Sequence, residues 1–176
     1  ARLTAMAEGS DVPVLITDGA SRAVTGPLTG PWTEVDLDTA DLDAQPDTPP
    51  PATPQHPGTL AYVIHTSGST GKPKGVRCTQ GGLAALLRAM GELMELTPDD
   101  RLASITTPAF DVSTVEMLAP LISGATLVVV PADDVADGAL LRARIEETRA
   151  TVVQGGPASW RRPASARSAP GSRGRC

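Results

Sequence analysis

The sequence contains few aromatic residues, few cysteines and no long apolar run. Aromatic residues make up 2% of the 176 residues, so a hydrophobic core has to be built from Ala, Val, Leu and Ile. The two cysteines are too few for a disulfide-bonded scaffold or a multi-cysteine zinc module. The best apolar run, residues 126–130, is much shorter than the roughly 18 residues of a membrane-spanning helix. No secretory signal is recognisable, so we expect a cytoplasmic protein with no membrane partner.

Positive charge is also scarce over most of the chain. The 15 basic residues are outnumbered by 20 acidic ones, and the net charge of −5 argues against a nucleic-acid partner. Lys72 and Lys74 are the only lysines. Residues 161–176 differ sharply, because they carry five arginines and no acidic residue. We interpret residues 161–176 as a disordered Arg/Pro/Ala/Ser tail encoded by a shifted reading frame. The alternative is a natural basic tail that contacts anions.

Strand-like and helix-like segments alternate over residues 60–153. The preceding residues 37–58 are rich in Asp, Pro and Thr and are interpreted as an exposed loop. Before that loop we predict a short helix at 3–9 and strands at 13–17 and 32–35. After it, the predicted strands are residues 60–65, 76–79, 102–106, 125–130 and 151–153, and the predicted helices are residues 82–94, 113–121 and 138–148. This alternation predicts an α/β fold with a mostly parallel sheet flanked by helices.

A glycine-rich loop, TSGSTGKPKG, follows the predicted strand at residues 60–65 and occupies residues 66–75. Its glycines allow the backbone to approach a ligand closely. Backbone N–H groups, hydroxyls and ammonium groups on one loop are the donors that a polyphosphate requires. The alternative is a surface turn that happens to be rich in Gly and Ser. The loop is not a Walker A loop, because Pro73 follows Lys72 and Thr66 replaces the first glycine.

Residues 62–76, YVIHTSGSTGKPKGV, resemble the signature phosphate loop of the AMP-binding, adenylate-forming superfamily. The resemblance implies that residues 1–160 form part of the large N-terminal subdomain of such an enzyme. It also implies binding of ATP and Mg²⁺: a substrate carboxylate attacks the α-phosphorus of ATP, releasing pyrophosphate and leaving an acyl-adenylate. The residues that the resemblance assigns to the ATP phosphates are Thr66, Ser67, Gly68, Ser69, Thr70, Gly71 and Lys74.

A second segment, FDVSTVE at residues 110–116, resembles the FDxS motif of nonribosomal peptide synthetase adenylation domains. In that branch the Asp accepts the α-ammonium of the amino-acid substrate, a role that the resemblance gives to Asp111. The same resemblance makes Val112 and Val115 pocket-lining residues. Residues 151–160, TVVQGGPASW, resemble another segment of these domains, which places Gln154 on the pocket wall. The implied partners are an amino acid, a peptidyl carrier domain bearing phosphopantetheine, and a condensation domain.

Simpler structural interpretations exist for several of these residues. Ser113 and Glu116 match the S-x-x-E capping box, which predicts that they cap a helix start. Asp111 precedes the box, and the alternative for it is solvation or helix capping. His65 stands where the family usually has Tyr and is interpreted as a packing substitution. We predict no metal site, because neither histidine belongs to a cluster of Cys, Asp or Glu.

The resemblance covers only part of an adenylation domain. The family's later acidic residues, which hold adenine, ribose and magnesium, and its closing lysine have no counterpart in this sequence. We therefore expect a truncated fragment that is inactive alone and contains no catalytic residue. One alternative is a fragment of an acyl-CoA synthetase-type enzyme, which needs no acidic residue at position 111. Another is a non-catalytic nucleotide-binding remnant.

Overall fold

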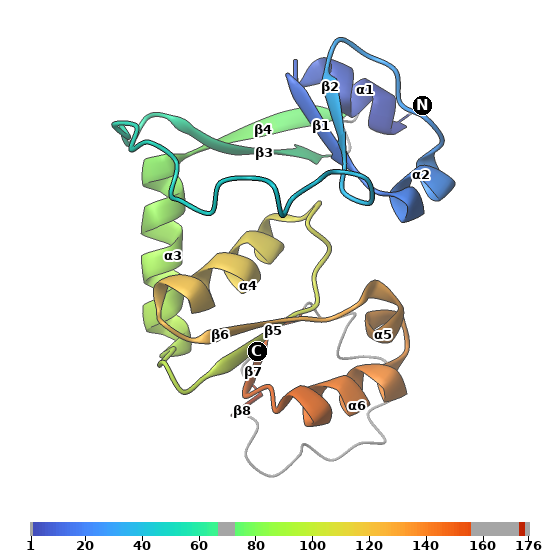
Figure 1. Cartoon of the computed structure of the whole chain (residues 1–176). Coiled ribbons are helices and arrows are strands. Elements are labelled where there is room, and N and C mark those ends of the chain that lie inside the picture. The colour runs from blue at the N-terminus through green and yellow to red at the C-terminus, as the bar shows by residue number, and fades with distance from the viewer. Residues whose placement is uncertain (1, 67–72, 156–172, 175–176) are drawn as a thin grey trace. The chain divides into compact units, whose positions relative to one another are not determined.

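A computed structural model describes residues 2–66, 73–155 and 173–174 of the chain. The chain divides into two compact units, residues 1–79 and residues 80–176, and each is considered by itself (Figure 1). Within the described ranges, no helix is long and apolar enough to cross a membrane.

The first unit begins with two short helices and a pair of parallel strands. These elements are α1 (Arg2–Gly9), β1 (Val14–Thr17), α2 (Gly19–Thr25) and β2 (Thr33–Asp36), and β1 pairs with β2. The Asp18 carboxylate caps α2 by accepting a hydrogen bond from the Ser21 N–H at 2.6 Å. Hydrogen bonding to Ser21 holds the pKa of Asp18 below its ordinary value of 3.8. Arg22 on α2 pairs with Glu34 and Asp36 on β2 and so ties the helix to the strand.

The first unit ends in a β-hairpin formed by β3 (Leu60–Thr66) and β4 (Lys74–Thr79). The two strands are antiparallel, with His65 opposite Gly75 and Thr66 opposite Lys74. This pair departs from the predicted mostly parallel arrangement. The reason is the short connection at residues 67–73, because a parallel crossover needs about a dozen residues or more.

The second unit is built around a parallel sheet. Its elements are α3 (Gln80–Met94), β5 (Arg101–Ser104), α4 (Asp111–Ile122), β6 (Thr126–Val129), α5 (Ala132–Ala136), α6 (Gly138–Thr148), β7 (Val152–Val153) and β8 (Arg173–Gly174). The strand order is β6-β5-β7-β8, and every neighbouring pair is parallel. The α/β fold predicted from the alternating pattern is therefore confirmed.

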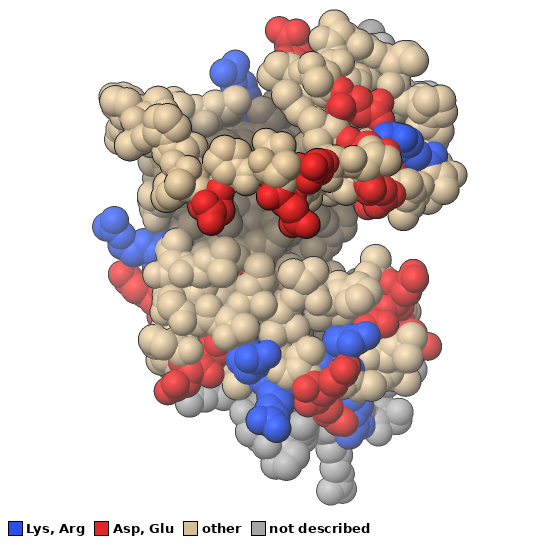
Figure 2. All heavy atoms as spheres, viewed as in Figure 1, with Lys and Arg blue, Asp and Glu red and all other residues tan. Residues whose placement is uncertain are grey.

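Both faces of this sheet are covered, because successive strand residues point to opposite sides. On one face Leu102 and Val152 pack with apolar residues of α3 and α4. On the other face Ala103 and Val153 belong to a second cluster, against which α5 and α6 pack (Figure 1). The outer side of α6 carries ion pairs, and Figure 2 shows basic and acidic atoms side by side there. The unit is thus a three-layer α/β/α sandwich.

Several element boundaries differ from those predicted. Helix α6 matches its predicted range, and Asp137 caps it by accepting from the N–H groups of Ala139 and Leu140. Helix α4 begins at Asp111, two residues before the predicted start. Helices α2 and α5 were not predicted. Of the tail, residues 173–174 form β8, and residues 161–172 and 175–176 lie outside the described residues.

Candidate functional site

The predicted phosphate loop connects the two strands of the hairpin. Thr66 and Lys74 face each other as the last paired residues before the loop, and both are exposed. The Thr66 hydroxyl donates a long hydrogen bond to the Lys74 carbonyl oxygen at 3.5 Å. The remaining predicted phosphate-binding residues, Ser67, Gly68, Ser69, Thr70 and Gly71, lie outside the described residues. The hydroxyl of Thr66 and the ammonium of Lys74 are donors suited to phosphate oxygens.

Gly75 allows a close approach beside the loop. A Cβ atom at this position would lie 3.0 Å from Cγ1 of Val63 and 3.4 Å from Nε2 of His65. The side chains of Val63 and His65 therefore occupy the space over Gly75. Gly75 thus leaves room for these two side chains where the loop joins β4.

His65 links the hairpin to the end of α1. Its Nε2 atom lies 3.3 Å from the hydroxyl of Ser10, and that hydroxyl donates to the Met6 carbonyl at 2.8 Å. Because the Ser10 hydroxyl has one proton, and that proton is directed to Met6, His65 Nε2–H is the donor to Ser10. His65 is therefore half-buried and hydrogen-bonded one residue before Thr66. The packing role predicted for His65 agrees with this position.

In the second unit, Asp111 lies in the first turn of α4 and is exposed. One of its oxygens accepts from the adjacent Val112 N–H at 2.9 Å. The N-cap residue is Phe110, whose side chain provides no cap hydrogen bond. A carboxylate near a helix N-terminus is favoured by the helix dipole, and an exposed carboxylate can also accept from a cationic ligand. Both interpretations of Asp111, helix stabilisation and ligand binding, fit this geometry.

The capping-box prediction for Ser113 and Glu116 is wrong. Ser113 is inside the helix, and its hydroxyl donates to the Phe110 carbonyl at 2.6 Å instead of accepting from a backbone N–H. Glu116 is fully buried and turns toward the end of β5. There it accepts from the N–H groups of Ile105 and Thr106 at 2.9 and 2.8 Å. The local pattern was misleading because the helix begins earlier, which directs Ser113 and Glu116 to the inner face.

The other predicted pocket residues have different surroundings. Val112 is exposed beside Asp111, whereas Val115 is buried in the core between α4 and the sheet. The pocket-lining role of both residues stays a prediction. Gln154 follows β7, and its Oε1 atom is buried without a hydrogen-bond partner in the described part of the chain.

Gln154 and the connection leading to Asp111 start at the same edge of the parallel sheet. Ala103 on β5 pairs with Val153 on β7, so Ser104 and Gln154 are the next residues at the carboxyl ends of these neighbouring strands. Open α/β sheets bind ligands at the carboxyl ends of their strands. The predicted amino-acid-binding residues thus follow the edge where such a fold places a ligand.

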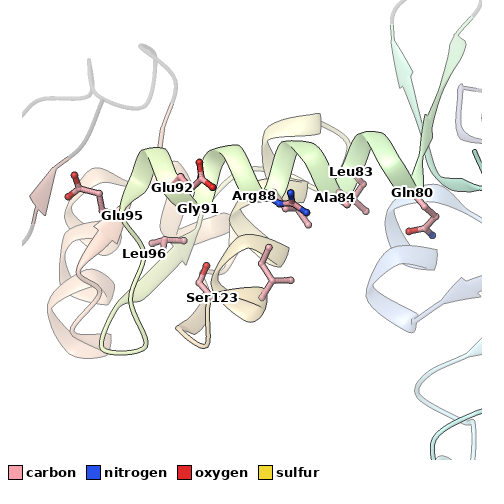
Figure 3. Close-up of a pocket in the computed structure, with 11 residues that line it drawn as sticks. Gln80, Leu83, Ala84, Arg88, Gly91, Glu92, Glu95, Leu96 and Ser123 are labelled. Carbon is pink, nitrogen blue, oxygen red and sulfur yellow. The ribbon is translucent and has the colours of Figure 1, made fainter. Parts of the chain in front are cut away.

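An open groove of about 660 Å³ lies on another part of the second unit. Figure 3 shows side chains of α3, including Leu83, Arg88 and Glu92, lining it together with Ser123 at the end of α4. None of the predicted site residues lines this groove. In the described ranges, no group of three or more His, Cys, Asp or Glu is arranged to hold a metal ion.

The sequence model of a family described as AMP-binding enzyme matches residues 1–173. The chain therefore belongs to the AMP-binding enzyme family. The resemblance drawn from the phosphate-loop sequence is confirmed.

The relatives include nonribosomal peptide synthetases. The chain is 43% identical over 100 residues to a dimodular nonribosomal peptide synthase of Bacillus subtilis (strain 168), a match that covers 57% of this chain and 4% of that protein. Among solved structures it resembles the nonribosomal peptide synthetase FmoA3 in its alpha-methyl-L-serine-AMP bound form, with a TM-score of 0.76 and 30% identity over 91% of this chain and 17% of that one. It also resembles a four-domain nonribosomal peptide synthetase bound to AMP and glycine, with a TM-score of 0.70 and 28% identity over 90% of this chain and 11% of that one. The chain thus spans a small part of each protein that it matches.

Proposed function

We propose that this chain is part of an amino-acid-activating adenylation domain of a nonribosomal peptide synthetase. The reaction joins the carboxylate of an amino acid to the α-phosphorus of ATP and breaks the bond to the leaving pyrophosphate. A carrier-protein thiol then attacks the acyl carbon of the aminoacyl-adenylate, which forms a thioester and releases AMP.

The observation that carries the proposal is the exposed carboxylate of Asp111 in the first turn of α4, where the connection from the carboxyl end of β5 enters the helix. A carboxylate provides a charge-assisted hydrogen bond to an α-ammonium group, which a fatty acid lacks. In this proposal Asp111 recognises the ammonium group, and the hairpin loop is assigned to the phosphates below. The similarity to synthetases with glycine and AMP, or with an aminoacyl-AMP, supports the same assignment.

The phosphate side of the reaction is assigned to Thr66, Lys74 and residues 67–71. Donors fixed around the phosphates stabilise the negative charge that develops as pyrophosphate leaves. Mg²⁺ and a carrier-bound phosphopantetheine belong to the proposal, and so do peptidyl carrier and condensation domains as partners. We assign no Mg²⁺ ligand to the described residues.

The decisive experiment is substitution of Asp111 in a complete adenylation domain that contains this chain. Amino-acid-dependent exchange of pyrophosphate into ATP is measured for a panel of amino acids, and the best substrate is compared with its des-amino analogue. In the proposal the bound amino acid covers Asp111 and buries the carboxylate–ammonium pair. Removing one partner of such a buried pair costs about 2–5 kcal/mol, so Asp111→Ala should lower kcat/KM for the amino acid by roughly 30- to 5000-fold. The preference over the des-amino analogue should fall, while the KM for ATP stays within about twofold.

Asp99→Asn is the matched control, since Asp99 is another exposed carboxylate, on the turn before β5. Equal losses for the amino acid and its analogue, with the preference unchanged, would reject ammonium binding by Asp111. A wild-type domain that prefers the des-amino acid would favour an acyl-CoA synthetase-type enzyme. No exchange with any acid would favour the non-catalytic remnant.

A further inference from the structure

Glu116 is a carboxylate that the proposed reaction does not use, yet it is among the most deeply buried side chains of the second unit. It has no exposed surface and lies on the inner face of α4 with Ser113, Ala119 and Pro120. Among the described residues no ion pair involves it. Burying a carboxylate is unfavourable unless hydrogen bonds replace its lost hydration.

Four donors from one short segment satisfy this carboxylate. Its Oε2 accepts from the N–H groups of Ile105 and Thr106 at 2.9 and 2.8 Å and from the Ser104 hydroxyl at 3.3 Å. Its Oε1 accepts from the Thr106 hydroxyl at 2.6 Å. All four donors belong to the end of β5 and the two residues that follow it. Glu116 therefore fixes the point where the chain leaves the sheet.

The same segment leads directly to Asp111. The chain turns after Thr106, where Phe110 N–H donates to the Thr107 carbonyl at 3.0 Å. Ser113 then holds the far end of the connection through its hydrogen bond to Phe110. Because α4 carries both Asp111 and Glu116, a bond from Glu116 to the strand end sets where the helix start lies relative to the sheet edge.

We propose that Glu116 is a positioning residue for Asp111: its four hydrogen bonds to residues 104–106 fix the start of α4 at the carboxyl edge of the sheet. This inference rests on the proposed function, because it concerns the group that would bind the amino acid. Glu116 itself contacts no substrate. Loss of its acceptors leaves the helix in place and frees the connection at 105–110, so Asp111 is misplaced.

Two substitutions separate the hydrogen bonds from the volume of the side chain. Glu116→Gln keeps an acceptor oxygen for the three donors at Oε2, and the Thr106 hydroxyl can rotate to accept from the new amide. Glu116→Met has a similar length and no comparable acceptor. A misplacement of about 1 Å can cost up to roughly 100-fold in rate, so Glu116→Met should lower kcat/KM for the amino acid about 10- to 100-fold. Glu116→Gln should stay within about threefold of wild type.

The readout that distinguishes positioning from general stability is the preference for the amino acid over its des-amino analogue. It is measured in the complete domain, with Glu92→Met on the exposed side of α3 as the control. Glu116→Met should reduce this preference and leave the KM for ATP within about twofold. Residues that act as a unit are not additive, so adding Glu116→Met to Asp111→Ala should lower the preference no further. A merely structural role would lower the yield of folded protein and leave the preference unchanged.

A third variant keeps the test decisive if Glu116→Met does not fold. Thr106→Val removes one hydroxyl donor and preserves the shape of the side chain, and it should lower the preference about 2- to 10-fold. Unchanged preference in every folded variant would overturn the positioning role while the effect of Asp111→Ala stands. If Asp111→Ala also leaves the preference unchanged, the proposed function itself fails.

Discussion

The hydroxyl of Ser10 lies 3.3 Å from Nε2 of His65, which joins the chain just after α1 to the end of β3. The Ser10 proton is directed to the Met6 carbonyl, so the imidazole has to donate. This contact lies one residue before the predicted phosphate loop. A side chain interpreted from the sequence as a packing substitution therefore also anchors the strand that leads into the loop.

We predict that neutral His65 carries its proton on Nε2. Nitrogen-15 NMR of the two imidazoles measures the tautomer directly. His56 provides an internal comparison, because its Nδ1 accepts from the Gly58 N–H at 3.0 Å and its proton is also expected on Nε2. Ser10→Ala should shift the tautomer equilibrium of His65 and leave that of His56 unchanged. A proton on Nδ1 of His65 in the wild type would contradict the hydrogen-bond assignment.

Gly75 provides a steric prediction for the hairpin. Gly75→Ala would place a Cβ atom 3.0 Å from Cγ1 of Val63. Val63 is β-branched and has little rotamer freedom, so this overpacking should destabilise the unit by about 1–3 kcal/mol in urea denaturation. Val63→Ala in the same chain should recover part of the loss. A neutral Gly75→Ala variant would show that the two strands can separate without cost.

The loop lysine provides a test of phosphate binding. Lys74→Ala removes an exposed side chain, so the free energy of unfolding should change by no more than about 0.5 kcal/mol. In the complete domain, loss of a donor to the developing charge should lower kcat/KM for the ATP half-reaction about 100-fold or more. Arg77→Ala is the matched control, because Arg77 is an exposed cation on the same strand. Equal small effects of the two variants would favour a plain surface turn.

The sequence predicted those elements whose signals are local. Helix α6 matches the predicted range to the residue, because Leu141 and Ile145 are spaced for one helix face. Helix α2 was missed because residues 19–25 are short and have no apolar periodicity. The alternation of strands and helices did not predict the antiparallel pairing of β3 and β4. Predicting it also required the length of the loop between the two strands.

Glu116 shows why part of the candidate site was not predictable from a motif. The S-x-x-E pattern describes partners within one helix, whereas the partners of this carboxylate lie on β5 and the connection after it. The 3.6-residue period of a helix could have placed Glu116 on the inner face, because it puts Glu116 on the same side as Ser113, Ala119 and Pro120, which are buried. The identity of the donors came only from the tertiary structure.

Gln154 provides the last prediction, which joins stability to specificity. Its Oε1 atom is buried, and in the described residues it accepts no hydrogen bond. Leaving a buried acceptor unpaired costs about 1–3 kcal/mol, a cost that an apolar side chain avoids. Gln154→Leu should therefore raise the free energy of unfolding of the 176-residue chain by about 1 kcal/mol, measured by urea denaturation.

The same substitution should change which amino acid the complete domain prefers, because an acceptor on the pocket wall selects a substrate group that donates to it. Gln154→Glu is the companion variant, since it keeps the acceptor and adds charge. It should favour substrates with a cationic or donor side chain in the pyrophosphate-exchange panel. A Gln154→Leu variant that is destabilised, with the substrate preference unchanged, would show that Gln154 is satisfied within the fold and does not line the pocket.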